Sequence, residues 1–211
     1  MMYLIRQPVI FFIFVGIGFA QSDITEGIRL TGGIAYSTVS GQDVHSEDGV
    51  KFHLGYKIGV EKALNTTINA GLNLVERGYN TSKTESNVDG TYKVEQEFSF
   101  QYISTYVYKS IPINNFKFYI GPELNYFLNA KFSINVSGGS HPFSDSQTWD
   151  IKEWKNADGK TFDYGIILGM VYPFTSEICL SANYFYGLSK WAKDLKAMNR
   201  SVQIFVSYDL F

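Results

Sequence analysis

Cysteine is almost absent from this 211-residue chain, in which Cys179 is the single example. One thiol excludes an internal disulfide and cannot supply the paired spacing of a zinc site. Histidine is also scarce, with three residues, so few side chains could serve as a general base or a metal ligand. We therefore expect a fold stabilised without cross-links, and the sequence predicts no cofactor.

Charge is low as well, at 18% of the residues, whereas an ordinary soluble domain carries roughly 25%. The formal net charge of -2 and the lack of a basic patch argue against nucleic acid as a partner. Aromatic residues are abundant, with 15 Tyr and 17 Phe. This combination suits a surface that meets lipid and carries amphipathic rings at its rims.

The N-terminus has the pattern of a secretion signal. Arg6 precedes an apolar run, residues 8–20, which is shorter than the roughly 20 residues that a helix needs to span a bilayer. Gly18 and Ala20 are small residues at the positions that a signal peptidase requires. We predict a signal peptide over residues 1–20 and one mature domain over 21–211. A retained helical anchor is the alternative.

The mature chain is dominated by alternation of apolar and polar residues, the period of a β-strand. Eight segments show it, at residues 28–37, 50–61, 67–74, 98–109, 116–129, 162–172, 178–186 and 201–210. Each has a length that crosses a bilayer when tilted, and an even number returns both termini to one side.

The connections between these segments alternate in length. Short ones lie at 62–65, 112–115 and 173–176, and long polar ones at 40–49, 80–95, 133–160 and 189–200. This asymmetry is typical of bacterial outer-membrane barrels. The sequence thus predicts an all-β fold, an eight-stranded antiparallel transmembrane up-and-down β-barrel in the bacterial outer membrane. A soluble β-sandwich or lipocalin-like barrel, with the apolar row inside, is the alternative.

The opposite row of each strand is expected to face a narrow lumen that side chains fill. It carries many glycines and charges of both signs, so ion pairs inside a plugged interior are expected. The predicted lumen charges are Arg29, Lys51, Lys57, Glu61, Arg77, Glu123 and Asp163. A narrow channel lined by these groups remains an alternative.

No catalytic constellation stands out, and we expect a protein that is not an enzyme. The alternative is an outer-membrane enzyme acting on lipid or peptide at the rim, which would need a base beside a nucleophile or an activated water. His45 and His141 lie in long polar connections, with Asp43 and Asp145 near them in sequence. No metal ligands are predicted.

Exposed aromatic residues in loops suggest a contact surface. Trp149, Ile151 and Trp154 lie in the connection 133–160, and Trp191 lies in the last one. We predict that these four form an interaction loop toward a partner protein or lipopolysaccharide. The alternative is that the tryptophans fold over the barrel mouth or lie at the membrane interface.

Several motifs resemble a known family: residues 55–59 (GYKIG), 121–126 (GPELNY) and 184–188 (YFYGL). They are similar to those of the outer-membrane β-barrel domain family common in Bacteroidota, which includes PorT-like and OmpA-like small barrels. The resemblance implies this fold and location, with a structural or interaction role, as in an accessory subunit of an envelope or secretion complex. Implied partners are outer-membrane lipid, lipopolysaccharide, the barrel-assembly machinery and other envelope proteins. No catalytic residue is implied.

Overall fold

The computed structural model describes residues 27–41, 50–87, 90–138, 142–191 and 197–210. The predicted signal peptide, His45, His141 and the C-terminal Phe211 lie outside these ranges. The described elements are β1 (Ile28–Ser40), β2 (Lys51–Ala63), β3 (Ile68–Asn87), β4 (Gly90–Ile113), β5 (Phe116–Gly138), β6 (Phe143–Asp150), α2 (Ile151–Asn156), β7 (Phe162–Pro173), β8 (Ile178–Gly187) and β9 (Met198–Asp209).

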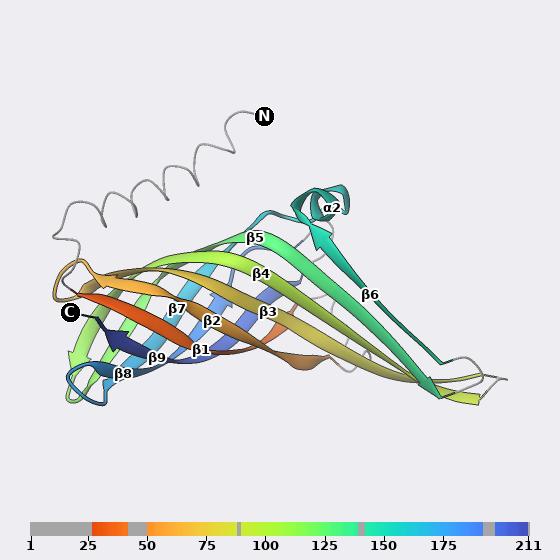
Figure 1. Ribbon diagram of the computed structural model, residues 1–211, viewed down its shortest axis with the longest axis horizontal. Coiled ribbons are helices and arrows are strands. Elements are labelled where there is room, and N and C mark those ends of the chain that lie inside the picture. The colour runs from red at the N-terminus through yellow and green to blue at the C-terminus, as the bar shows by residue number, and fades with distance from the viewer. Residues whose placement is uncertain (1–26, 42–49, 88–89, 139–141, 192–196, 211) are drawn as a thin grey trace.

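Eight of these strands close into a barrel (Figure 1). Each of β1 to β5 pairs antiparallel with the next, β5 also pairs with β7, β8 pairs with both β7 and β9, and β9 returns to pair with β1. Among the described strands, β6 pairs only with β5, and it lies outside the ring. The predicted eight-stranded antiparallel barrel is therefore confirmed, with one additional strand that the sequence analysis assigned to a loop.

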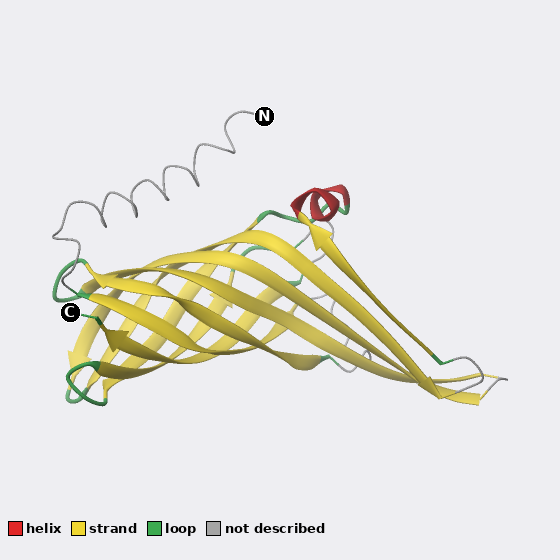
Figure 2. Cartoon of the chain, in the orientation of Figure 1, coloured by secondary structure: helices red, strands yellow, loops and turns green. Residues whose placement is uncertain are grey.

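Three strands continue past the barrel at one end. β3, β4 and β5 have 20, 24 and 23 residues, whereas the other five barrel strands have between 10 and 13. The extensions and β6 form a four-stranded sheet that tapers away from the body (Figure 2). We call it the projecting sheet; it consists of residues 80–87, 90–97, 131–138 and 143–150.

The expectation of polar loops over 80–95 and most of 133–160 is therefore wrong. The β3–β4 register continues without a break from Asn80 opposite Glu97 to Asn87 opposite Gly90. Here β3 and β6 are mostly polar on both faces, so the apolar row that identifies strands in the body is largely missing from their sequence. β5 keeps a short alternating row, Phe132, Ile134 and Val136, within a connection that is otherwise mostly polar.

The opposite end of the barrel, which we call the turn end, has the three short connections that the sequence predicts. They join β2 to β3, β4 to β5 and β7 to β8, and the C-terminus of β9 lies at the same end (Figure 1). Asn65 stabilises the first turn by accepting hydrogen bonds from the backbone N–H groups of Thr67 and Ile68 at 2.9 and 2.8 Å. Asn114 adopts a φ of 53° in the second turn, a conformation that asparagine tolerates well.

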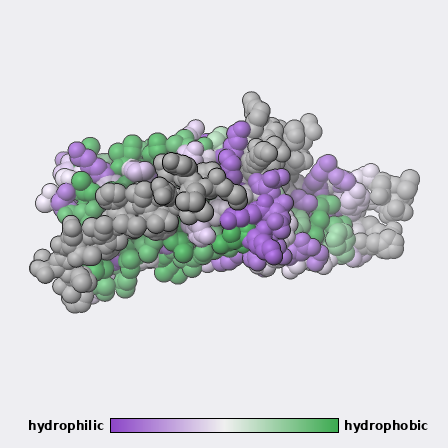
Figure 3. All heavy atoms as spheres, turned by 90° about the horizontal axis from the view of Figure 1, so that it is seen from above, coloured by the Kyte–Doolittle hydropathy of each residue, from purple (hydrophilic) through white to green (hydrophobic). Residues whose placement is uncertain are grey.

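The apolar row points outward on every body strand except β4, whose Phe100, Tyr102, Tyr106 and Tyr108 are buried and face the lumen, contrary to the expected outward row. On β2, Leu54 and Ile58 are 63% and 60% exposed, whereas His53 and Lys57 on the alternate row are buried. Apolar side chains form a broad surface over the barrel body, and polar residues gather toward the projecting sheet (Figure 3). A soluble sandwich would bury the outward row, so this arrangement contradicts that alternative.

Candidate functional site: a charged lumen beneath an aromatic cluster

Buried charges lie in the middle of the lumen, where strands from opposite walls approach each other. The guanidinium of Arg77 on β3 forms an ion pair with the carboxylate of Glu123 on β5. The same guanidinium lies 4.0 Å from the ring centroid of Phe185 on β8, a cation–π contact. Both charged side chains are fully buried, so each depends on the other for compensation.

Lys57 is a second buried cation. Its Nζ lies 4.3 Å from the ring centroid of Phe205 and 4.8 Å from that of Tyr106. Glu61 and Glu123 interact with it electrostatically. Two aromatic faces and two carboxylates thus compensate the charge of Lys57 inside the barrel.

Toward the turn end, Glu61 accepts hydrogen bonds from two tyrosines. The hydroxyl groups of Tyr108 and Tyr106 donate to it at 2.7 and 3.1 Å. Arg29 Nη1 lies 3.5 Å from Glu61, and Arg29 Nε donates to Asp209 at 2.5 Å. This network joins β1, β2, β4 and β9 across the lumen.

Toward the other end, Asp163 on β7 is buried and accepts two hydrogen bonds. One comes from the hydroxyl of Ser189, which follows β8, and one from Asn199 Nδ2 on β9 at 2.7 Å. The sequence placed Asp163 in the lumen by parity but gave no sign of these partners, because strand pairing decides which residues meet across a barrel.

Lys51 is the predicted lumen charge that does not lie inside. It is exposed at the start of β2, opposite Asn80. By the alternation of β2, Lys51 would face the lumen. It is exposed because it lies at the level where β3 extends past the barrel into the projecting sheet. There Lys51 lines a polar hollow of about 320 Å³ on that sheet.

Aromatic clusters fill the lumen on both sides of the buried charges. The cluster near the turn end contains Tyr106, Tyr108, Tyr119, Ile167, Val171, Cys179 and Phe185. The cluster at the mouth contains Phe100, Tyr102, Phe127, Trp154 and Trp191 among others. Filling by side chains is what an eight-stranded barrel of this width allows.

The tryptophans close the mouth and do not form the exposed contact loop that the sequence suggested. Trp154 and Trp191 are 8% and 6% exposed. The ring of Trp154 stacks on Phe127 with centroids 5.1 Å apart, and that of Trp191 lies 4.5 Å from Phe100. Trp149 and Ile151, half-buried, pack against the same cluster. Burial of these large apolar rings is more favourable than their exposure to water.

A short helix holds Trp154 in place. Asp150 and Glu153 form a capping box at the start of α2, each side chain accepting from the other residue's backbone N–H. The indole Nε1 of Trp154 donates to the carbonyl of Lys160 at 2.9 Å, so burial leaves no unpaired donor on the ring. The residues of the capping box can be found in the sequence. They lie in a long polar stretch that the sequence analysis assigned to a loop, so the helix was not predicted.

The projecting sheet has two different faces. The face continuous with the lumen joins the barrel at an aromatic stack, in which the ring centroids of Tyr79 and Phe98 are 4.6 Å apart and that of Phe98 lies 4.7 Å from that of Phe132 in the sheet. The other face is rich in Ser, Thr, Asn, Lys and Glu. Nearly every residue of β6 is exposed, and β6 has no neighbour on its outer side among the described strands.

Ionisable groups at the far end of the projecting sheet interact in water. The Tyr92 hydroxyl donates to Glu85 at 2.6 Å and Lys83 Nζ lies 3.0 Å from the same carboxylate. The hydrogen bond from Tyr92, followed by the contact with Lys83, lowers the pKa of Glu85, and the bond to Glu85 raises the pKa of Tyr92. Such exposed pairs contribute little to stability.

His53 has a structural environment. It is buried, with Nε2 3.0 Å from Glu76 and Nδ1 3.2 Å from Glu97. In the described ranges, no group of three or more His, Cys, Asp or Glu side chains is arranged to hold a metal ion. The two histidines on which the enzyme alternative depends, His45 and His141, are outside the described residues.

None of the described helices has the length and apolar character needed to cross a bilayer.

A closed ring of eight antiparallel strands, apolar outside and polar within, defines a class: the transmembrane β-barrels of bacterial outer membranes. Comparison with known families agrees. The model of the outer membrane protein beta-barrel domain matches residues 19–193, so the chain belongs to that family and is located in the bacterial outer membrane.

Neisserial surface protein A is a solved structure that shares the fold. It superposes with a TM-score of 0.50 at 14% identity, over 88% of this chain and 98% of that one. Ail, the attachment invasion locus protein of Yersinia pestis, gives 0.47 at 14% identity, over 87% and 99%. No curated protein matches the sequence. At these identities the likeness concerns the fold alone.

Proposed function

We propose that this protein is a non-enzymatic outer-membrane barrel that presents the projecting sheet to a protein partner outside the cell. The supporting observation is the open edge of β6. Its eight residues, Phe143–Asp150, pair with β5 on one side, and no described strand lies on the other. An exposed edge is a template for an added strand, and main-chain hydrogen bonds give such additions their affinity.

The body of the barrel favours a support over a pore or a catalyst. Aromatic clusters fill the lumen above and below the Arg77–Glu123 pair. Trp154 and Trp191 contribute to closing the mouth and do not project from it. The barrel thus fixes the base of the projecting sheet, and the sheet carries the surface that a partner can reach.

The sequence resemblance to the Bacteroidota PorT-like barrels supports a more specific version of this role. In it, the protein is an accessory subunit of an envelope or secretion complex, and its partner is another envelope protein. Outer-membrane lipid and lipopolysaccharide would surround the body, and the barrel-assembly machinery would insert it.

The test is to block the β6 edge with charge and leave the rest of the sheet intact. Lysine on an edge strand hinders the addition of another strand. The variant is Ser146→Lys with Thr148→Lys on β6, and the matched control is Ser133→Lys with Asn135→Lys on β5, an interior strand of the same sheet. Each protein is cross-linked in intact cells, purified from solubilised outer membranes and analysed by mass spectrometry.

We expect one protein to be captured by the parent and by the β5 variant but not by the β6 variant. Equal loss in both variants would mean that charge alone disturbs the contact. Equal capture by all three would place the contact elsewhere and contradict the proposal. Heat-dependent gel mobility shows whether each variant is folded.

A further inference from the structure

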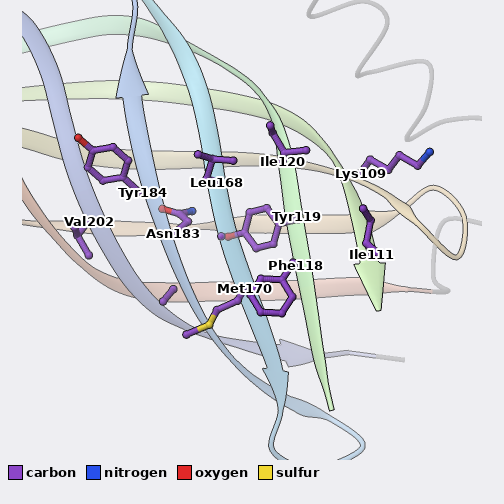
Figure 4. Close-up of a pocket in the computed structure, with 12 residues that line it drawn as sticks. Lys109, Ile111, Phe118, Tyr119, Ile120, Leu168, Met170, Asn183, Tyr184 and Val202 are labelled. Atoms are coloured by element: carbon purple, nitrogen blue, oxygen red, sulfur yellow. The ribbon is translucent and has the colours of Figure 1, made fainter. Parts of the chain in front are cut away.

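The outer wall of the barrel is hollowed between β4 and β9, on the face that meets lipid. The hollow has a volume of about 560 Å³, within the range of about 300–1,000 Å³ found for small-molecule sites. Two rows of outward side chains border it, one from Lys109 through Leu168 to Val202 and one from Ile111 through Met170 to Ala182. We call it the wall groove (Figure 4).

The small side chain of Ala182 makes the wall groove deep. Gly169 lies between the two rows but belongs to the lumen row, where a Cβ would come within 2.4 Å of the ring of Tyr119, so this glycine makes room for that buried ring. Tyr119 and Asn183, its neighbours on the adjacent strands, are buried and close the floor of the groove (Figure 4). Ala182 leaves space between Met170 and Ile204, its outward neighbours on the adjacent strands. A larger aliphatic side chain at position 182 would fill this part of the groove.

The wall groove crosses the membrane obliquely. Its lower end is at Ile111 and Lys109, two and four residues before the end of β4 at the turn end. Its upper end is at Val202, four residues after the start of β9 near the mouth. Short turns face the periplasm in barrels of this kind, so the groove rises from the periplasmic leaflet toward the bilayer centre.

Lys109 gives the groove its one charged side chain. It is exposed, and no carboxylate among the described residues forms a salt bridge with it. The remaining lining is almost entirely apolar. The long side chain of Lys109 can extend past Ile111 toward the leaflet surface, as lysine side chains do at membrane interfaces. Its ammonium group and the apolar trough match the two parts of an anionic phospholipid.

We propose that the wall groove binds one phospholipid of the periplasmic leaflet, with an acyl chain in the trough and the anionic headgroup at Lys109. The shape complementarity comes from the space at Ala182, and the charge complementarity from Lys109. A phospholipid oriented this way has its headgroup at the membrane surface and its chain in the hydrocarbon, as the bilayer requires. The contact would be longer-lived than that of lipids on the rest of the wall.

Native mass spectrometry of the detergent-solubilised full-length mature barrel tests this proposal, with phosphatidylglycerol and the zwitterionic phosphatidylcholine as probes. We expect a single phosphatidylglycerol to remain bound. Lys109→Gln should weaken its binding about fivefold, the effect of one cation near a membrane surface. Ala182→Leu should abolish the preference for one bound lipid by filling the trough.

Two matched variants control for general changes of charge and surface. Lys117→Gln removes an exposed lysine at the same end that does not line the groove, and Val206→Leu adds bulk to a lipid-facing position of β9 outside it. Both should bind phosphatidylglycerol like the parent. Equal binding of the two lipids, equal effects of Lys109→Gln and Lys117→Gln, preferential retention of lipopolysaccharide, or a dimer formed through this face would each overturn the proposal.

Discussion

The barrel body and the projecting sheet are built from the same three strands, yet the two regions follow different rules. Along β4, the even-numbered residues from Phe100 to Ser110 form a buried lumen row, whereas residues 90–97 are exposed or half-exposed throughout. The hydrogen-bonded register of β3 with β4 is continuous across the boundary. The two regions differ in their surroundings. The strands of the body contact lipid and a filled lumen, and those of the projecting sheet contact water.

This difference separates two sources of stability. In the body, buried charges and aromatic rings depend on partners from distant strands, as Arg77 depends on Glu123. In the projecting sheet, the ion pairs, such as Lys93 with Glu95, are local and exposed. Substitutions in the body should therefore destabilise the protein, and comparable ones in the sheet should affect its surface.

The largest difference is expected for a buried against an exposed ion pair. Arg77→Ala leaves the buried Glu123 without its ion-pair partner, with only the longer-range interaction with Lys57, and should lower the free energy of unfolding by about 3–5 kcal/mol. Lys93→Ala breaks a solvent-exposed pair with Glu95 and should give no measurable change. Urea titration of the protein folded in lipid vesicles, followed by gel mobility without boiling, measures both.

A double variant sharpens this prediction. Arg77→Met with Glu123→Leu removes both charges and keeps apolar volume, so it should be far more stable than Arg77→Ala alone. If the double variant were as unstable as the single one, the main contribution of Arg77 would be its packing on Phe185 and not its charge.

The second comparison concerns aromatic side chains. Trp154→Ala removes a ring packed between Phe100 and Phe127 and should cost about 3–5 kcal/mol in the same titration. Phe143→Ala acts on a ring that is 53% exposed at the start of β6 and should change stability by less than about 0.5 kcal/mol. Similar losses for both would show that the sheet and the body unfold as one unit.

Strand alternation in the sequence predicted the body because lipid imposes an apolar outer row, visible in residues such as Leu54 and Ile58. The same reasoning placed Lys57, Arg77 and Asp163 in the lumen, where they are buried. It failed for β4, whose aromatic row, including Tyr102 and Tyr106, fills the lumen and does not face lipid. It failed also for β6, where most positions are polar on both faces. It also failed for the tryptophans, because a loop residue's burial depends on how the loop folds back, which alternation does not encode.

The third prediction tests whether the body is independent of the sheet. Replacing residues 81–96 by Asn-Gly joins Asn80 to Glu97, which are already opposite each other, through a two-residue hairpin turn. The urea midpoint of unfolding of the body should equal that of the parent, since the lumen charges and the mouth cluster lie on the barrel side of the deletion. A large fall in the midpoint would contradict the division into two regions.

The smallest expected effect lies at the end of the projecting sheet. The hydrogen bond from Tyr92 holds the pKa of Glu85 below its ordinary value, so Tyr92→Phe should move that pKa upward. A carboxylate with a depressed pKa stabilises the folded hairpin above the unfolded-state pKa, and this contribution is lost as the pH falls through the folded-state pKa. NMR titration of the side-chain carboxyl carbon reports the shift.

Ser86→Ala on the neighbouring position is the control, because the Ser86 hydroxyl pairs with Thr91 and not with Glu85. If the pKa of Glu85 were unchanged in Tyr92→Phe, the contact with Lys83 alone would account for the lowered pKa. The tyrosine would then contribute nothing to holding β3 and β4 together at this end beyond their backbone pairing.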